Sequence, residues 1–98
     1  MKNSIIQAKS YNFALKIIQL YKSMRTQRQE YTLAKQILRS GTSIGANVEE
    51  ALGGQSGKDF VAKLSIAYKE ARETGYWIRL LSDSNMVDGA TSESLLSD

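Results

Sequence analysis

The strongest constraint on this chain is a helical stripe of apolar residues that continues through the small-residue stretch RSGTSIGANVEE. Glycine in a helix interior costs roughly 1 kcal/mol relative to alanine, and serine, threonine and asparagine are also weak helix formers. Apolar residues nevertheless recur at helical spacing on both sides of the stretch and within it: Leu33, Ala34, Ile37, Ile44, Val48, Ala51 and Leu52. Gly41 holds a position of the same stripe. The pattern predicts one helix over residues 30–53, made small on one side where another helix approaches closely.

Two further helices follow from the same periodicity. The first covers about residues 3–27, with an inner face of Ile6, Phe13, Ile17, Leu20 and Met24. Another covers about residues 57–82, with Ser56 as its N-cap and an inner face of Phe60, Leu64, Ala67, Ala71, Ile78 and Leu81. The polar end of the chain holds only a stub, about residues 92–98, which Thr91 or Ser92 could cap. Residues 1–98 are therefore expected to form one all-α domain.

The first helix carries more apolar surface than one packed helix needs. Its apolar residues cover about half of the circumference, whereas a stripe of about 100° is enough for one contact. Ile5 and Leu15 fall outside even that wide face. This surplus indicates a second burial partner, and we expect another copy of the chain.

The net charge of +3 is divided unevenly along the chain. Residues 1–40 hold eight basic residues and one acid, whereas residues 41–98 hold five basic residues and nine acids. This division suggests a basic surface that meets a polyanion, and the alternative is that the lysines only solvate helices. The candidate nucleic-acid contacts are Lys9, Lys16, Lys22, Arg25, Arg28, Lys35 and Arg39.

Composition and motifs predict no catalytic, cofactor or metal site. The chain has no cysteine and no histidine, which removes thiol nucleophiles, the commonest general base and the commonest metal ligand. The turn GGQSGK suggests a P-loop, but Leu52 and Asp59 stand where that motif needs glycine and Ser or Thr. The acids Glu49, Glu50, Glu70 and Glu73 lack the histidines of a di-iron bundle. A structural role is expected instead, in which Asn47, Glu50, Glu70 or Glu73 hydrogen-bonds across the seam between helices.

Aromatic residues and targeting features add little to the functional prediction. Tyr68, Tyr76 and Trp77 could stack on bases, but packing is the commoner role of aromatics at helical spacing. No apolar run is long enough to span a bilayer, and the N-terminus lacks the features of a secretory signal. A cytoplasmic protein without enzymatic activity or membrane contact is expected.

The segment ILRSGTSIGANVEEALGGQSGKDFVAKLSIAYKEARETGYWIRLL closely resembles the four-helix-bundle proteins encoded in 23S ribosomal RNA intervening sequences. The matching positions are Arg39, Ser40, Ser43, Ile44, Asn47, Glu50, Phe60, Glu70, Glu73, Tyr76 and Trp77. The resemblance implies an antiparallel up-down four-helix bundle that assembles into a ring-shaped homopentamer. Members of the family normally continue into a full fourth helix. Because this chain shows only a stub, the rest of the fourth-helix position is expected to be filled by further chain or by a neighbouring subunit. Accessory proteins of diversity-generating retroelements, which are similar in fold, bind nucleic acid and a reverse transcriptase.

Two hypotheses of function follow, with a shared structural seam. The seam is expected to consist of Arg39, Ser40, Gly41, Ser43, Ile44, Gly45, Asn47, Glu50, Glu70, Glu73, Tyr76 and Trp77. In the first hypothesis the protein is an oligomer that binds nucleic acid, RNA in preference to DNA, through its basic N-terminal half. In the second hypothesis it is an oligomeric scaffold or adaptor for a protein partner and has no direct contact with nucleic acid.

Overall fold

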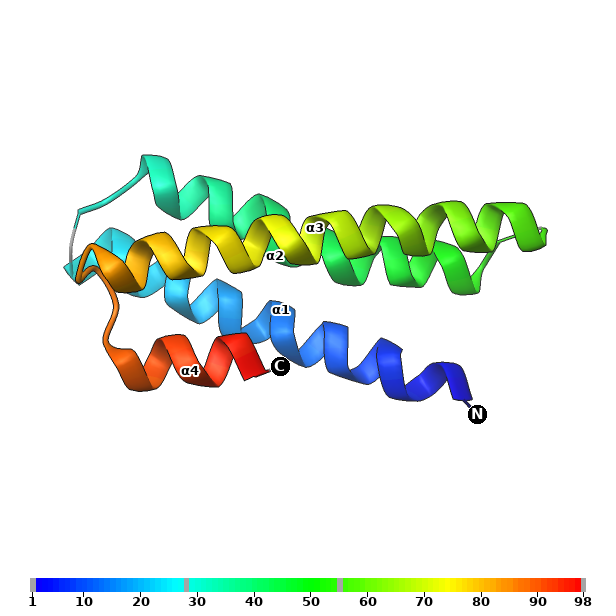
Figure 1. Ribbon diagram of the computed structural model, residues 1–98, viewed down its shortest axis with the longest axis horizontal. Coiled ribbons are helices and arrows are strands. Elements are labelled where there is room, and N and C mark those ends of the chain that lie inside the picture. Colours follow the sequence, from blue (N-terminus) through cyan, green and yellow to red (C-terminus); the bar gives the residue numbers. More distant parts are fainter. Residues whose placement is uncertain (1, 28, 55, 98) are drawn as a thin grey trace.

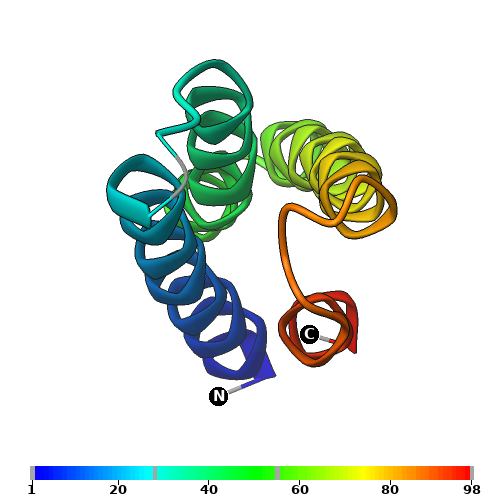
Figure 2. The ribbon, with the colours of Figure 1, turned by 90° about the vertical axis from the view of Figure 1, so that its left-hand side faces the viewer.

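Four α-helices form the computed structural model, which describes residues 2–27, 29–54 and 56–97. They are α1 (Lys2–Gln27), α2 (Thr32–Leu52), α3 (Gly57–Asp83) and α4 (Gly89–Ser97). Successive helices run in opposite directions (Figure 1). Viewed along the bundle, α1 packs on α2, α2 packs on α3, and the short α4 packs on α3 (Figure 2). The prediction of an all-α up-down bundle with a short fourth helix is therefore confirmed.

The start of α2 differs from the prediction by two residues. Gln29 has a φ of 53°, in the left-handed region, and α2 begins only at Thr32. The Glu30 carboxylate, which was predicted to lie in the first turn, instead accepts a hydrogen bond at 2.8 Å from the Leu33 backbone N–H. An acid at this end satisfies a free donor and interacts favourably with the helix dipole.

The start of α4 also differs, because neither Thr91 nor Ser92 is its cap. The Asp88 carboxylate accepts a hydrogen bond at 2.7 Å from the Thr91 backbone N–H, and the helix begins at Gly89. This hydrogen bond holds the pKa of Asp88 below its ordinary value. Ser92 lies buried inside the helix. At α3 the predicted cap is present, since the Ser56 hydroxyl accepts from the Asp59 N–H at 3.1 Å.

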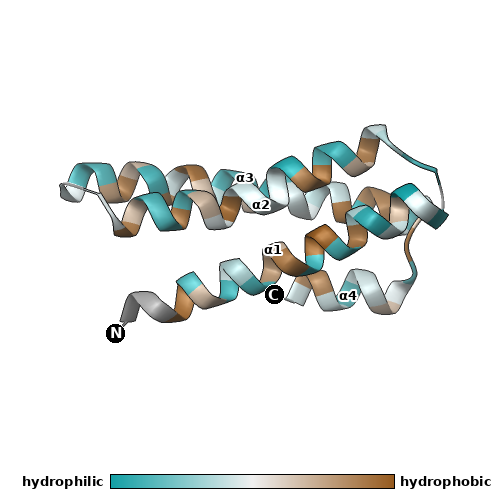
Figure 3. Ribbon diagram, turned by 180° about the vertical axis from the view of Figure 1, so that it is seen from behind, coloured by the Kyte–Doolittle hydropathy of each residue, from teal (hydrophilic) through white to brown (hydrophobic). Residues whose placement is uncertain are grey.

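The main core lies in the half of the bundle that contains all four helices. Its buried members are Ile17, Leu20, Met24, Ala34, Ile37, Ile78, Leu81 and Leu95. Apolar residues, brown in Figure 3, recur along all four helices. Two residues of the predicted inner faces, Ile6 and Ala71, are exposed instead. The reason is that, among the described residues, α4 ends at Ser97 and does not lie opposite them.

The small-residue stretch is part of α2 and lies where α1 approaches α2 closely. A Cβ atom on Gly41 would lie 2.7 Å from Cγ1 of Ile17, and one on Gly45 would lie 3.3 Å from the Ser10 carbonyl oxygen. Both distances are shorter than ordinary van der Waals contact between carbon atoms or carbon and oxygen. The prediction that a helix continues through this stretch is confirmed, and the two glycines permit the close packing of α1.

Candidate functional site

The first candidate site is a basic surface at the end of the bundle where α1 turns into α2. The guanidinium carbon of Arg25 lies 5.6 Å from the centre of the Tyr21 ring and 5.3 Å from that of the Tyr31 ring. Lys22 lies three residues before Arg25 on α1, and Lys35 lies four residues after Tyr31 on α2. Residues three or four apart are neighbours on a helix surface. The contact between Arg25 and Tyr31 therefore joins both lysines into one surface, which we call the basic end.

The aromatic residues of the basic end were missed by the sequence analysis. Arg25 Nη1 donates to the Tyr21 hydroxyl at 3.1 Å, and the Tyr31 side chain is 48% exposed. Such cation–π contacts contribute about 0.5–1 kcal/mol each at exposed sites. In the sequence, the only signal for this cluster was that Tyr21 lies four positions before Arg25. The approach of Tyr31 to Arg25 depends on the turn between α1 and α2. Glu30, in the turn before Tyr31, is hydrogen-bonded to the Leu33 N–H. A second acid, Asp88, lines a pocket at the same end of α1 together with Met24 and Gln27.

Other predicted nucleic-acid contacts lie elsewhere on the molecule. Lys9 and Lys16 are exposed, and because Lys16 follows Lys9 by seven positions, both lie on one side of α1. Lys22 follows Lys16 by six positions, a rotation of about 240° around the helix, so this side of α1 differs from the basic end. Arg28 lies outside the described residues. A single chain therefore divides the predicted contacts between at least two surfaces.

Arg39, which was predicted both as a nucleic-acid contact and as a seam residue, lies at the seam between α2 and α3. Its Nη1 donates to Glu70 Oε1 at 3.2 Å, and its Nη2 donates to Glu73 Oε2. The indole N–H of Trp77 donates to the same Glu73 oxygen at 3.0 Å. Because the Arg39 side chain is 51% exposed, solvent screens these ion pairs, and their contribution to stability is modest.

A buried polar contact lies one residue along α2 from Arg39. The Ser40 and Thr74 side chains are 0% and 1% exposed, and their hydroxyl oxygens lie 2.9 Å apart. The Thr74 oxygen also lies 2.7 Å from the Glu70 carbonyl oxygen. A hydroxyl carries one hydrogen, so the Thr74 hydroxyl cannot donate to both oxygens. Both hydrogen bonds form only when Thr74 donates to Glu70 and Ser40 donates to Thr74. The contact links α2 to α3 on the side of α2 next to Gly41.

Thr74→Val is expected to lower the free energy of unfolding by about 1–3 kcal/mol, because Ser40 would remain buried without its partner. Thr26→Val is the matched control. The Thr26 hydroxyl also donates to the carbonyl four residues before it, at 2.8 Å, but its side chain is exposed. We expect less than about 0.5 kcal/mol for the control in urea unfolding. Equal losses in the two variants would contradict the assigned role of the buried pair.

Other seam residues have mixed surroundings. Glu50 accepts from Lys63 Nζ at 2.9 Å across α2 and α3, and this hydrogen bond raises the pKa of Lys63. Asn47 bonds within its own helix, donating to the Ser43 carbonyl at 2.8 Å. The buried Ser43 hydroxyl has no hydrogen-bond partner among the described residues. Ile44 is half-buried and faces the gap between α1 and α3.

The aromatic residues of α3 divide between packing and exposure. Trp77 is half-buried and packs against the core, as its predicted structural role requires. Tyr76 is 50% exposed and touches the edge of the Trp77 ring, with the ring centres 5.4 Å apart. Tyr68 is 65% exposed. Core packing therefore accounts for Trp77 but not for the two tyrosines.

The described residues were also searched for metal ligands and membrane spans. Within the described ranges, no three or more acidic, histidine or cysteine side chains gather in a way that could hold a metal ion. None of the helices in that part of the chain combines the length and the apolar character that crossing a bilayer requires.

Comparison with known proteins gives a matching family and similar solved structures. The family model described as 23S rRNA-intervening sequence protein matches residues 2–98. A crystal structure from Bacteroides thetaiotaomicron is described as a protein with unknown function from the S23 ribosomal protein family. It is 46% identical, with a TM-score of 0.96, and the match covers 99% of this chain and 87% of that chain. No curated protein matches.

Proposed function

The chain belongs to the 23S rRNA-intervening sequence protein family, and we propose that it is a non-enzymatic protein that binds nucleic acid, preferentially RNA, through its basic end. The observation that carries this proposal is the contact of Arg25 with Tyr31, 5.3 Å from cation to ring centre. This contact supports the assignment of Lys22, Arg25 and Lys35 to one surface that also presents an aromatic ring. The non-enzymatic part rests on the sequence, which contains neither histidine nor cysteine.

The chemistry of the basic end suits a single-stranded polyanion. Lysine and arginine side chains neutralise phosphates and release counterions, which gives affinity without base preference. An exposed tyrosine supplies a face on which one base can stack, and stacking contributes about 1–3 kcal/mol per base. The Arg25 guanidinium already lies against two rings, and the side of it that faces neither ring is available to a phosphate. We therefore expect binding with a strong salt dependence and little sequence preference.

Assembly of several copies would strengthen this binding, and we include a homo-oligomer in the proposal. Ile5 is 64% exposed and Leu15 is 44% exposed on α1, which supports a contact between copies. The homopentamer implied by the family resemblance would carry a net charge of +15, since each chain carries +3. Several basic ends on one assembly would also bind one long strand simultaneously, which raises the apparent affinity.

Charge reversal at the basic end is expected to weaken RNA binding by about tenfold or more, because two phosphate contacts become repulsive. The variant is Lys22→Glu/Lys35→Glu, measured by fluorescence anisotropy with labelled single-stranded RNA and DNA across a salt series. The matched control is Lys58→Glu/Lys69→Glu, which changes two exposed lysines of α3 and gives the same net charge. Each lost contact should reduce the slope of log affinity against log salt by about 0.7.

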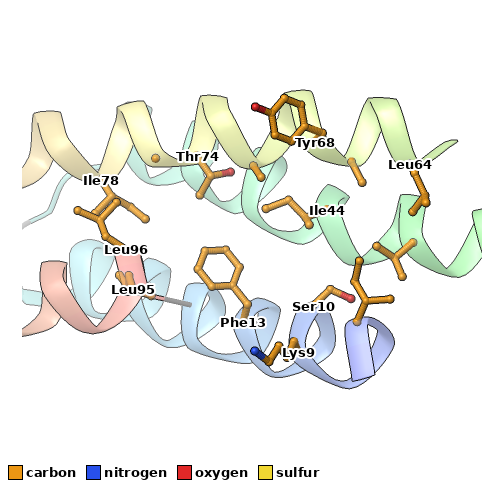
Figure 4. A pocket seen from close by; sticks show the side chains of 15 residues that line it. Lys9, Ser10, Phe13, Ile44, Leu64, Tyr68, Thr74, Ile78, Leu95 and Leu96 are labelled. Carbon is orange, nitrogen blue, oxygen red and sulfur yellow. The ribbon is translucent and has the colours of Figure 1, made fainter. Parts of the chain in front are cut away.

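Two outcomes would contradict the proposal. Equal weakening in the two charge-reversal variants would show that only the total charge matters. Absence of binding at low salt, with helix content and oligomeric mass unchanged, would remove the nucleic-acid function. The second candidate function, a scaffold for a protein partner, would then remain. The observation that favours it is a pocket between α1 and α3 that is lined mainly by apolar residues (Figure 4).

A further inference from the structure

A pocket lies at the end of the bundle where α1 and α3 end and α4 begins (Figure 1). Its polar lining residues are Ser23, Gln27, Ser82, Asn85, Asp88 and Thr91. Its apolar lining includes Leu20 and Met24 of α1 and Met86 and Val87 of the turn between α3 and α4. Its volume of about 500 Å³ lies within the roughly 300–1,000 Å³ that is typical of small-molecule sites. The pocket is therefore large enough for a small organic ligand, and we call it the end pocket.

The end pocket is formed by internal segments of the chain. Its residues from α1 lie near the C-terminal end of that helix, whereas the N-terminus of the chain lies at the opposite end of the bundle (Figure 1). Its residues from α4, Gly89 and Thr91, belong to the first turn, and the helix runs from there away from the pocket toward Ser97 (Figure 1). The pocket therefore depends on how α1 packs beside the turn between α3 and α4.

The charges in this part of the chain are negative. Residues 80–97 contain the acidic residues Asp83, Asp88 and Glu93 and no basic residue. Asp88 itself lines the end pocket, and none of the lining residues that the structure describes is basic. Arg25, the basic residue in the last turn of α1, lies on another side of that helix, because Gln27 follows it by two positions, a rotation of about 200°. The side chains around the pocket therefore attract a cation and repel an anion.

The helix dipoles at the end pocket act in the same direction. Both α1 and α3 end here, and the C-terminus of a helix carries a partial negative charge. The last turn of α3 has no basic residue that would compensate this charge, and it ends in Asp83. The N-terminus of α4 has the opposite sign, but Asp88 caps it by accepting a hydrogen bond from the Thr91 N–H at 2.7 Å. The dipoles therefore also favour a cation in the pocket.

The lining of the end pocket combines hydrogen-bond acceptors with apolar surface. The Gln27 Oε1 atom accepts from the Ser23 hydroxyl at 3.2 Å, and an amide oxygen can accept a second hydrogen bond. The Asp88 carboxylate has about four acceptor sites, so it can bind a ligand while it caps α4. Leu20 and Met24 are 8% and 2% exposed, which fixes an apolar surface beside these acceptors. A matching ligand carries N–H donors at one end and an alkyl chain at the other.

We propose that the end pocket binds a small organic cation, a guanidinium or ammonium group on a short alkyl chain. The cationic group donates hydrogen bonds to Asp88 and Gln27, and the alkyl chain packs against Met24 and Met86. Charge selects a cation, and burial of the chain distinguishes it from an inorganic cation. This proposal goes beyond nucleic-acid binding, because its ligand has the opposite charge and Gln27 lies on a different side of α1 from Arg25 of the basic end.

The test titrates n-butylguanidinium into the full chain at constant ionic strength and follows the backbone amide signals by NMR. We expect the largest shifts at Asn85, Asp88 and Thr91, which line the end pocket. Butylurea has nearly the same shape without the charge and should bind at least about tenfold more weakly. Guanidinium without the alkyl chain should also bind at least about tenfold more weakly. Two further ligands distinguish the source of the cation: agmatine represents a free diamine, and N-acetylarginine amide represents an arginine side chain of a protein.

Two matched pairs of variants locate the binding site. Asp88→Asn removes the charge from the end pocket but keeps the cap of α4, since asparagine caps helices as well as aspartate does. Glu93→Gln removes the same charge at an exposed position of α4 that does not line the pocket. We expect about tenfold weaker binding of n-butylguanidinium for the first variant and less than about twofold for the second. Gln27→Lys, which places a cation in the pocket, and Gln19→Lys, at an exposed position of α1 outside it, should differ in the same way.

Three results would overturn the proposal. These are equal binding of n-butylguanidinium and butylurea, equal effects of Asp88→Asn and Glu93→Gln, and absence of localised shifts at the highest soluble ligand concentration. Binding of either agmatine or N-acetylarginine amide supports the proposal, and the tighter of the two identifies the source of the cation. RNA binding by Asp88→Asn should stay within about twofold of that by Glu93→Gln, so the two proposals fail independently.

Discussion

Replacement of Gly41 by leucine is expected to lower the free energy of unfolding by about 3 kcal/mol, at the upper end of the usual cost of overpacking. A Cβ atom alone would lie 2.7 Å and 2.9 Å from the two γ carbons of Ile17. Ile17 is itself 0% exposed, so it has little space into which to move. The better helix propensity of leucine offsets less than about 1 kcal/mol of this loss. Urea unfolding followed by circular dichroism measures the difference.

Gly75→Leu is the control for this substitution. Gly75 also lies inside a long helix, but a Cβ atom there would meet nothing within 4 Å. We expect this variant to keep or raise the free energy of unfolding, by up to about 1 kcal/mol, because only helix propensity changes. Losses of similar size at the two glycines would show that close packing of α1 on α2 is not what requires Gly41.

Ile37→Ala is expected to produce a second large loss, about 2–5 kcal/mol in the free energy of unfolding. Ile37 is 0% exposed and belongs to the cluster that joins α1, α2, α3 and α4. Removing three carbon atoms there forfeits their burial and leaves a cavity in the half of the bundle that holds the main core. Thermal and urea unfolding should both detect the loss.

Ile66→Ala isolates the contribution of burial. Ile37 and Ile66 both lie in helices, and both variants replace isoleucine with alanine, so the change in helix propensity is the same. Ile66 is 39% exposed, and we expect its loss to be less than about 1 kcal/mol. A loss at Ile66 as large as that at Ile37 would indicate that this surface is buried in an assembly of several chains.

Local features of the fold were predictable where they depend on neighbours in sequence. The stripe from Leu33 to Leu52 predicted α2 through its glycines, because a period of 3.6 residues repeats over many turns. The Ser56 cap was equally local. The predicted cap of α4 was wrong, since Asp88, Thr91 and Ser92 all suit that position and only the backbone geometry selects Asp88.

The candidate site was predictable only in part. The excess of basic residues before residue 41 is visible in the sequence, and Lys22, Arg25 and Lys35 are exposed as a nucleic-acid contact requires. Their spatial grouping was not predictable, because it depends on how the turn between α1 and α2 brings Tyr31 to Arg25. Helical rotation also separates Lys16 from Lys22, which a count of charges does not reveal.

The sequence alone determined the helices and the uneven charge, since each depends on residue type and on spacing along the chain. Tertiary structure decided which surfaces remain open. Ile6 and Ala71 carry the same inward-facing pattern as Ile17 and Ile78, yet only the latter pair is buried. Burial depends on whether another helix lies opposite, and Leu95 of α4 belongs to the same buried cluster as Ile17 and Ile78. The basic end likewise results from a contact between side chains of different elements, across the turn between α1 and α2.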